Sequence, residues 1–201
     1  MDESVPVACV LLMRLTDRAL LQDGQGTNLI LEREVSQPME GIRIVELPKC
    51  KMVSSGPADE GNPFAEDGIL RSFDKWFSAA DAKRTDKFFP RDFMWFDRET
   101  QRLVWYYVLP DGMTDTGGFE VVDFEGGLYA AHISKDGDDV DGERVYAGIK
   151  KWVAESAVFV LDERPGHYDL FHITTPPKVA EAMGYSQLDI YVPIKLRETS
   201  C

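Results

Sequence analysis

Residues 167–171 place an imidazole, a carboxylate and aromatic rings within five positions. Side chains two residues apart share one face of a β-strand, so His167, Asp169 and Phe171 are expected to point the same way. A carboxylate among aromatic rings attracts a cation by charge pairing and by cation–π attraction. His167 and Asp169 also have the spacing of an acid/base pair. The plainer alternatives are a solvated or locally hydrogen-bonded Asp169 and a surface or core His167.

More aromatic side chains are concentrated at residues 93–96 and 105–107. Strand alternation places successive side chains on opposite faces of the expected sheet. The resemblance described below implies that helices cover one of these faces and that the other lines a ligand groove. The expected groove residues are Met94, Phe96, Trp105, Tyr107, Asp169, Phe171 and Tyr191, together with His167. Trp95, Tyr106, Tyr168 and Leu170 fall on the helix-covered face, unless a bulge exchanges Trp95 and Tyr106. A filled core explains any single ring, but we expect at least two of Trp105, Tyr107, Phe171 and Tyr191 to line a pocket.

The elements that carry these residues repeat along the chain. Residues 41–47 and 118–124 align without a gap in apolar and charged character, and Trp76 is echoed by Trp152. A repeat of this length is typical of a supersecondary unit that packs against its own copy. Each copy is predicted as strand, helix, strand, strand, at residues 42–54, 66–82, 93–96 and 103–109, then 119–133, 144–155, 168–173 and 188–196. The strand predictions break at Pro48 and at Gly126–Gly127, and the fold class is α+β.

Four short motifs follow one another in the second half, at residues 119–130, 160–165, 168–171 and 189–194. Together they resemble the GyrI-like (gyrase-inhibitor-like) effector-binding family, over about residues 41–196. The resemblance implies two modules about a pseudo-twofold axis, with helices on one sheet face and a small-molecule groove on the other. It also implies that Asp169 meets cationic ligands, although the family usually has the longer Glu at this position.

The resemblance divides the chain into two parts. Residues 1–40 would form an N-terminal arm or hairpin, and residues 41–201 the effector-binding domain. Within that domain, the first repeat covers residues 41–113 and the second covers residues 117–196.

Composition limits the classes of partner. A net charge of −13 argues against nucleic acid and anionic membranes, because both require clustered Lys and Arg. The apolar run 5–13 is too short to span a bilayer and lacks the basic start of a signal peptide. Three cysteines without metal-like spacing predict reduced thiols in a cytoplasmic protein. The acidic run 136–143 lacks the EF-hand pattern, so neither a metal nor a cofactor is expected.

The sequence therefore favours a cytoplasmic protein that binds or sequesters an amphipathic small molecule of cationic, aromatic character. One alternative is a hydrolase of electrophilic xenobiotics, in which Asp169 or His167 orients water. Another is a ligand-sensing subunit for a separate regulator. A regulator partner and a homodimer are both left open.

Overall fold

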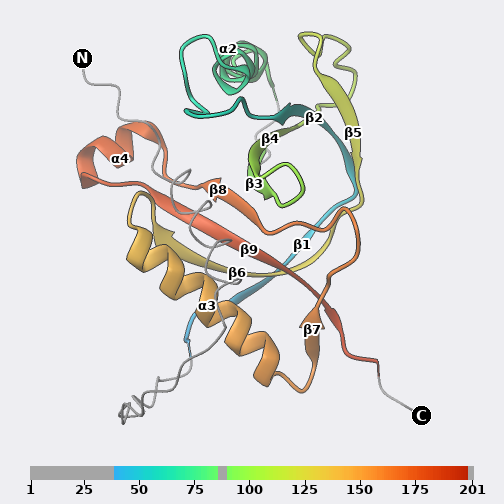
Figure 1. Cartoon of the computed structure of the whole chain (residues 1–201), viewed down its shortest axis with the longest axis vertical. Helices are drawn as coiled ribbons and strands as arrows, with labels where there is room; N and C mark the ends of the chain where they lie inside the picture. Colours follow the sequence, from blue (N-terminus) through green and yellow to red (C-terminus); the bar gives the residue numbers. More distant parts are fainter. Residues whose placement is uncertain (1–38, 86–89, 199–201) are drawn as a thin grey trace.

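The α+β class is confirmed by a computed structural model that describes residues 39–85 and 90–198. Its core is a curled antiparallel sheet (Figure 1). The strands are β1 (Arg43–Leu47), β2 (Cys50–Pro57), β3 (Asp92–Asp97), β4 (Arg102–Val108), β5 (Glu120–Phe124), β6 (Gly127–Lys135), β7 (Phe159–Leu161), β8 (Leu170–Ile173) and β9 (Gln187–Leu196). The helices are α2 (Ile69–Asp81), α3 (Asp139–Glu155) and α4 (Pro177–Met183). Apart from its last two residues, the predicted arm 1–40 lies outside the described residues.

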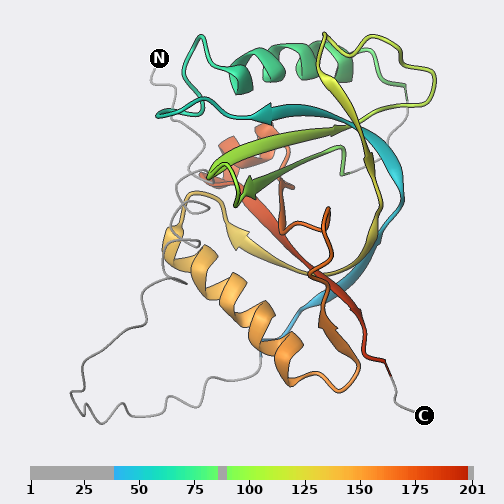
Figure 2. The same ribbon diagram turned by 45° about the vertical axis from the view of Figure 1, so that its right-hand side comes forward.

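The order of strands in the sheet interleaves the two predicted repeats. It runs β1-β6-β9-β8-β3-β4-β2-β5, and β7 pairs separately with β9. β1 is antiparallel to β6, and β2 is antiparallel to β5, with Arg43 opposite Ala131 and Cys50 opposite Phe124. The first strand of each repeat is thus interrupted at the predicted place and pairs with its counterpart on both sides of the interruption. These pairings bend the sheet into the curl seen in Figure 2.

Gly126 lies where the two interrupted strands pass closest to each other. Its φ is +68°, in the left-handed region that favours glycine. A Cβ at this position would come within 2.7 Å of the Lys49 nitrogen and of the Pro48 carbonyl carbon. The second interruption therefore requires a residue without a side chain.

Both long helices form where apolar side chains recur at helical spacing. α2 buries Leu70, Phe73 and Ala80 and packs mainly on β2 and β4. α3 packs on β6, β9 and β7. It starts five residues before the predicted position, because the Asp138 side chain accepts a hydrogen bond from the Asp141 main-chain N–H at 3.0 Å. The acidic run thus forms the first turn of the helix.

α4 was not predicted, because its residues read as a long loop between the last two strands. Pro177 is the first residue of this helix, a position where the missing N–H costs nothing. Gly184 follows its last residue with φ of +76°, and its N–H donates to the Ala180 carbonyl. Pro177 and Gly184 are both visible in the sequence, and the residues between them are enough for one short helix.

The sheet has one helix-covered face and one helix-free face. The helix-covered face packs against buried side chains of the two long helices: Val145, Ile149 and Val153 of α3, and Leu70 and Phe73 of α2. The helix-free face is the inside of the curl. Its buried residues all come from strands: Leu47, Met52, Phe93, Trp95, Val104, Tyr106, Phe124, Tyr129, Ala131, Leu170 and Tyr191.

Candidate ligand-binding surface

Asp169 lies directly before β8 and is held from two sides. Its Oδ2 accepts a hydrogen bond from the Tyr146 hydroxyl of α3 at 2.7 Å. The Arg98 guanidinium, from the turn between β3 and β4, reaches the same oxygen at 3.4 Å. The Asp169 side chain is 19% exposed, whereas that of Arg98 is 69% exposed. The carboxylate is therefore mostly enclosed, and its charged partner is mostly in water.

Half-buried apolar side chains lie on the same face of the neighbouring strands. Met94 of β3 is opposite Phe171 of β8 and opposite Trp105 of β4. Continuing the β3–β8 register places Phe96 beside Asp169. β3 and β8 lie in the middle of the sheet, between the strands that α2 and α3 cover. We call Asp169, Tyr146, Arg98, Met94, Phe96 and Trp105 the central surface.

Trp105 is the most firmly fixed aromatic residue of the central surface. Its indole N–H donates to Asp92 Oδ2 at 2.9 Å, and its main-chain N–H donates to Ser55 Oγ at 2.9 Å. Its ring lies 5.6 Å from Phe77 and 5.7 Å from Phe73 of α2, measured between centroids. These contacts leave it half-buried, with the remaining surface available to a ligand.

Tyr146 keeps its proton and so remains a donor to Asp169. Burial raises the pKa of the Tyr146 phenol, and the neighbouring Asp169 carboxylate raises it further. The Lys150 ammonium lies 4.5 Å from the centre of the same ring. This hydroxyl therefore orients the carboxylate without neutralising it.

The face assigned to most of the expected groove residues is wrong. Phe171 packs in the cluster that contains the core residues of α3, and Phe96 and Trp105 pack against it. Met94 shares their side of the sheet by register, and Tyr107 lies under α2. Tyr191 is on the helix-free face as expected. Trp95, Tyr106, Tyr168 and Leu170, expected under the helices, join it there. Alternation sorts strand residues into two sets, but it does not say which set the helices cover.

Three of the expected aromatic walls present almost no surface. Tyr107 is 0% exposed, Phe171 3% and Tyr191 4%. Phe77 of α2 packs edge-on against Tyr107 with ring centroids 4.7 Å apart. The Tyr191 hydroxyl donates to Asp189 at 3.1 Å, deep in the sheet. Of the four rings expected to line a pocket, only Trp105 is accessible.

His167 and Asp169 do not form a pair in the structure. His167 Nδ1 is 3.5 Å from Asp162 Oδ2, and Arg164 binds the same carboxylate through Nε and Nη2. The acid/base residues of the hydrolase hypothesis therefore have separate partners. Tyr146 and Arg98, which do contact Asp169, carry no signal in the sequence that would have indicated them.

Asp162 stabilises the turn before Asp169, and this stabilisation depends on pH. Its side chain is 2% exposed, and the hydrogen bond from Arg164 lowers the pKa of this carboxyl. A lowered folded-state pKa stabilises the fold above the unfolded value, and this contribution is lost as pH falls through the folded value. We expect Asp162→Asn to lower the free energy of unfolding by about 1–3 kcal/mol at pH 7. The deficit should shrink below about pH 4. Urea unfolding at both pH values measures it, and an equal deficit at both would contradict the assignment.

Two other site classes leave no trace in the described residues. Across residues 39–85 and 90–198, no group of three or more His, Cys, Asp or Glu side chains is placed to hold a metal ion. Within the same ranges, no helix has the length and apolar character needed to cross a membrane.

Comparison with known proteins supports the fold and not a specific activity. No protein family and no curated protein matches the sequence. Among solved structures, the EcmrR C-terminal domain aligns at 12% identity with a TM-score of 0.54, covering 77% of this chain and 97% of that one. A hydrolase from Listeria innocua aligns at 14% identity, with a TM-score of 0.47 and coverage of 80% and 94%. SAV2435 bound to tetraphenylphosphonium aligns at 11% identity, with a TM-score of 0.48 and coverage of 77% and 94%.

The protein therefore shares the fold of the EcmrR C-terminal domain. That fold agrees with the GyrI-like architecture expected from the sequence. At such low identity the likeness concerns architecture alone.

Proposed function

We propose that this protein binds an amphipathic small molecule of cationic, aromatic character on the central surface. The observation that supports this most directly is the enclosed Asp169 carboxylate next to Phe96, on a sheet face that also carries the half-buried Met94 and Trp105. Its nearest cation, Arg98, is mostly exposed and makes a 3.4 Å contact. Charge, apolar surface and a displaceable counter-ion thus occur in one place.

Binding would exchange one cation for another at Asp169. Arg98 is mostly exposed and only reaches Asp169 at 3.4 Å, so its pairing contributes about 1 kcal/mol or less and moving it into water costs little. An aromatic cation would gain the same carboxylate and would also cover Phe96 and Trp105, with cation–π attraction to the indole. The hydroxyl of Tyr146 would keep Asp169 oriented throughout. The apolar contacts therefore favour the ligand over Arg98.

We further propose that the two repeats each supply one side of the site. Residues 41–113 contribute Met94, Phe96, Arg98 and Trp105, whereas residues 117–196 contribute Tyr146 and Asp169. Met94 and Phe171 are opposite each other where β3 meets β8, which is one of three places where strands of the two repeats pair. A site at such a place is expected if the repeats evolved as a closed pair.

Two substitutions should change affinity in opposite directions. Tetraphenylphosphonium is a suitable probe for isothermal titration calorimetry, because it is an aromatic cation without hydrogen-bond donors. Asp169→Asn keeps the shape and the acceptor for Tyr146 but removes the charge, so the affinity should fall about 10- to 100-fold. Arg98→Gln removes the competing cation, so the affinity should rise by up to about fivefold.

The control separates a local effect from the overall negative charge. Asp123→Asn changes net charge by the same amount, at an exposed residue whose carboxylate pairs with Lys51 at 2.9 Å. It should leave tetraphenylphosphonium affinity unchanged. Neutral triphenylphosphine oxide should bind wild type and Asp169→Asn equally. Equal effects of Asp169→Asn and Asp123→Asn would reject the central surface as the site.

A further inference from the structure

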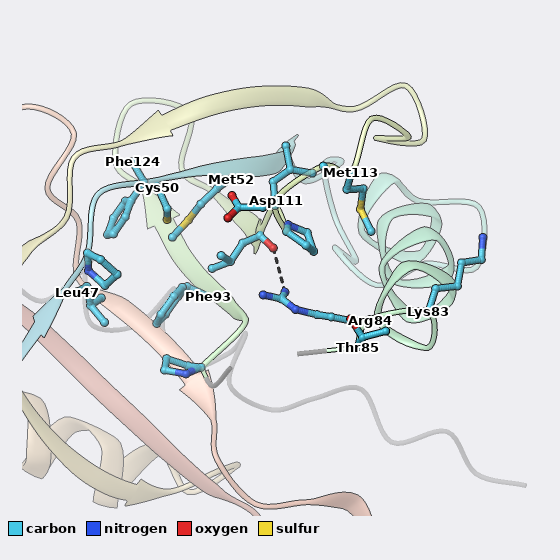
Figure 3. A pocket seen from close by; sticks show the side chains of 16 residues that line it. Leu47, Cys50, Met52, Lys83, Arg84, Thr85, Phe93, Asp111, Met113 and Phe124 are labelled. Carbon is cyan, nitrogen blue, oxygen red and sulfur yellow. Dashed lines mark hydrogen bonds between the residues drawn. The ribbon is translucent and has the colours of Figure 1, made fainter. Parts of the chain in front are cut away.

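The helix-free face contains a cavity that the central surface does not explain. It has a volume of about 650 Å³, and the side chains that line it are drawn in Figure 3. Its apolar lining comes from five strands, β1 to β5: Leu47, Cys50, Met52, Phe93, Val108 and Phe124. Volumes of 300–1,000 Å³ and the mouths of barrel-like sheets are typical of small-molecule sites. The cavity is thus large enough for a ligand of moderate size.

This cavity is separate from the central surface. No residue of the central surface lines it. β3 contributes to both, but with alternate side chains: Phe93 faces the cavity side, whereas Met94 faces the helix-covered side. The sheet itself therefore stands between the two sites. A ligand in one does not touch the residues of the other.

One charged group extends along the cavity wall. The Arg84 guanidinium, just past the end of α2, points inward and donates to the Val108 carbonyl at 3.1 Å, as Figure 3 shows. The same Nη1 is 3.3 Å from the Tyr107 hydroxyl, so the guanidinium is held in place. Lys83 also lines the cavity, but its ammonium points away from the Arg84 guanidinium in the same view. Arginine binds a carboxylate through two parallel N–H donors, which makes a fixed guanidinium a selective partner.

The other residues that line the cavity indicate what the rest of a carboxylate ligand would be like. Burial raises the pKa of the Cys50 thiol, so this group stays neutral and acts as apolar wall. Val108 and Met113 are half-buried and line the same space. Asp111 also lines the cavity and is exposed at the Pro110–Met113 turn, where it disfavours a second negative charge. An apolar body with a single anionic group fits this arrangement.

We propose that the cavity binds an amphipathic monocarboxylate, with its apolar body against Cys50, Val108 and Met113 and its carboxylate on Arg84. The site does not depend on the proposed cation site, because the two share no residue.

The test uses 11-(dansylamino)undecanoic acid, whose fluorescence rises in an apolar environment, and its methyl ester as the uncharged match. Wild type should bind the acid about tenfold more tightly than the ester, or better. Arg84→Met should bind acid and ester equally. Because the comparison is made within one protein, a small loss of stability in the variant does not affect it.

A second variant tests the cavity without touching the charge. Cys50→Phe fills the space and should weaken binding of acid and ester alike, by at least about tenfold. Lys51→Met, the control, removes a cation that pairs with Asp123 outside the cavity and should bind both as wild type does. Asp169→Asn should also leave acid binding unchanged, so failure of the cation site would not affect this result. The proposal is overturned if wild type binds acid and ester equally or neither of them, or if Cys50→Phe binds as wild type does.

Discussion

Gly126→Ala is expected to lower the free energy of unfolding by about 2–5 kcal/mol. Alanine at φ of +68° is strained, and its Cβ would overlap main-chain atoms of Pro48 and Lys49. Main chain cannot move aside as a flexible side chain can, so β1–β2 and β5–β6 would have to separate. Those strands join the two repeats at the closed side of the curl. The substitution therefore weakens the connection between repeats and not one turn alone.

A matched glycine separates the steric effect from the conformational one. Gly56 has φ of +70°, almost the value at Gly126, but an added Cβ there would meet nothing within 4 Å. Gly56→Ala should cost only the left-handed backbone penalty, about 1–2 kcal/mol. Urea unfolding monitored by tryptophan fluorescence measures both variants. Equal losses would mean that the close approach of Gly126 to Pro48 and Lys49 does not hold in solution.

The helices and strands could be predicted from local patterns, because each of them depends on residues that are close together in the sequence. Apolar residues at helical spacing placed α2 over residues 66–82, close to its observed Ile69–Asp81. The breaks at Pro48 and Gly126–Gly127 were predicted from residues that cannot continue a strand. The pairing of β1 with β6 could not be, because it joins positions such as Arg43 and Ala131 that no local pattern links.

In the candidate site, too, some residues could be predicted from the sequence, whereas their contacts could not. Asp169 was identified through a resemblance, and the structure shows that its side chain is mostly enclosed. Its two partners are a helix residue, Tyr146, and a turn residue, Arg98, and both contacts depend on tertiary placement. The cavity at Arg84 was not predicted either. The cavity forms between strands that are distant in the sequence, and the sequence of a single strand does not predict how far it lies from the others.

Phe73→Ala is expected to lower the free energy of unfolding by about 3–5 kcal/mol. Phe73 is fully buried between α2 and the sheet, with its ring 5.0 Å from Phe119 and 5.7 Å from Trp105, measured between centroids. Removing it leaves a cavity that these fixed rings cannot fill. This loss is a large share of the 5–15 kcal/mol typical of a native domain.

The same substitution links stability to the central surface, because Trp105 rests on Phe73. Phe73→Leu keeps most of the volume and should cost less than Phe73→Ala, by at least about 1 kcal/mol. Val140→Ala, at a mostly exposed position of α3, should stay within about 0.5 kcal/mol of wild type. If α2 supports the binding surface, Phe73→Leu should weaken tetraphenylphosphonium binding while leaving the ester of the dansyl acid unaffected. A variant that loses stability yet binds the cation as before would show that Trp105 keeps its position without α2.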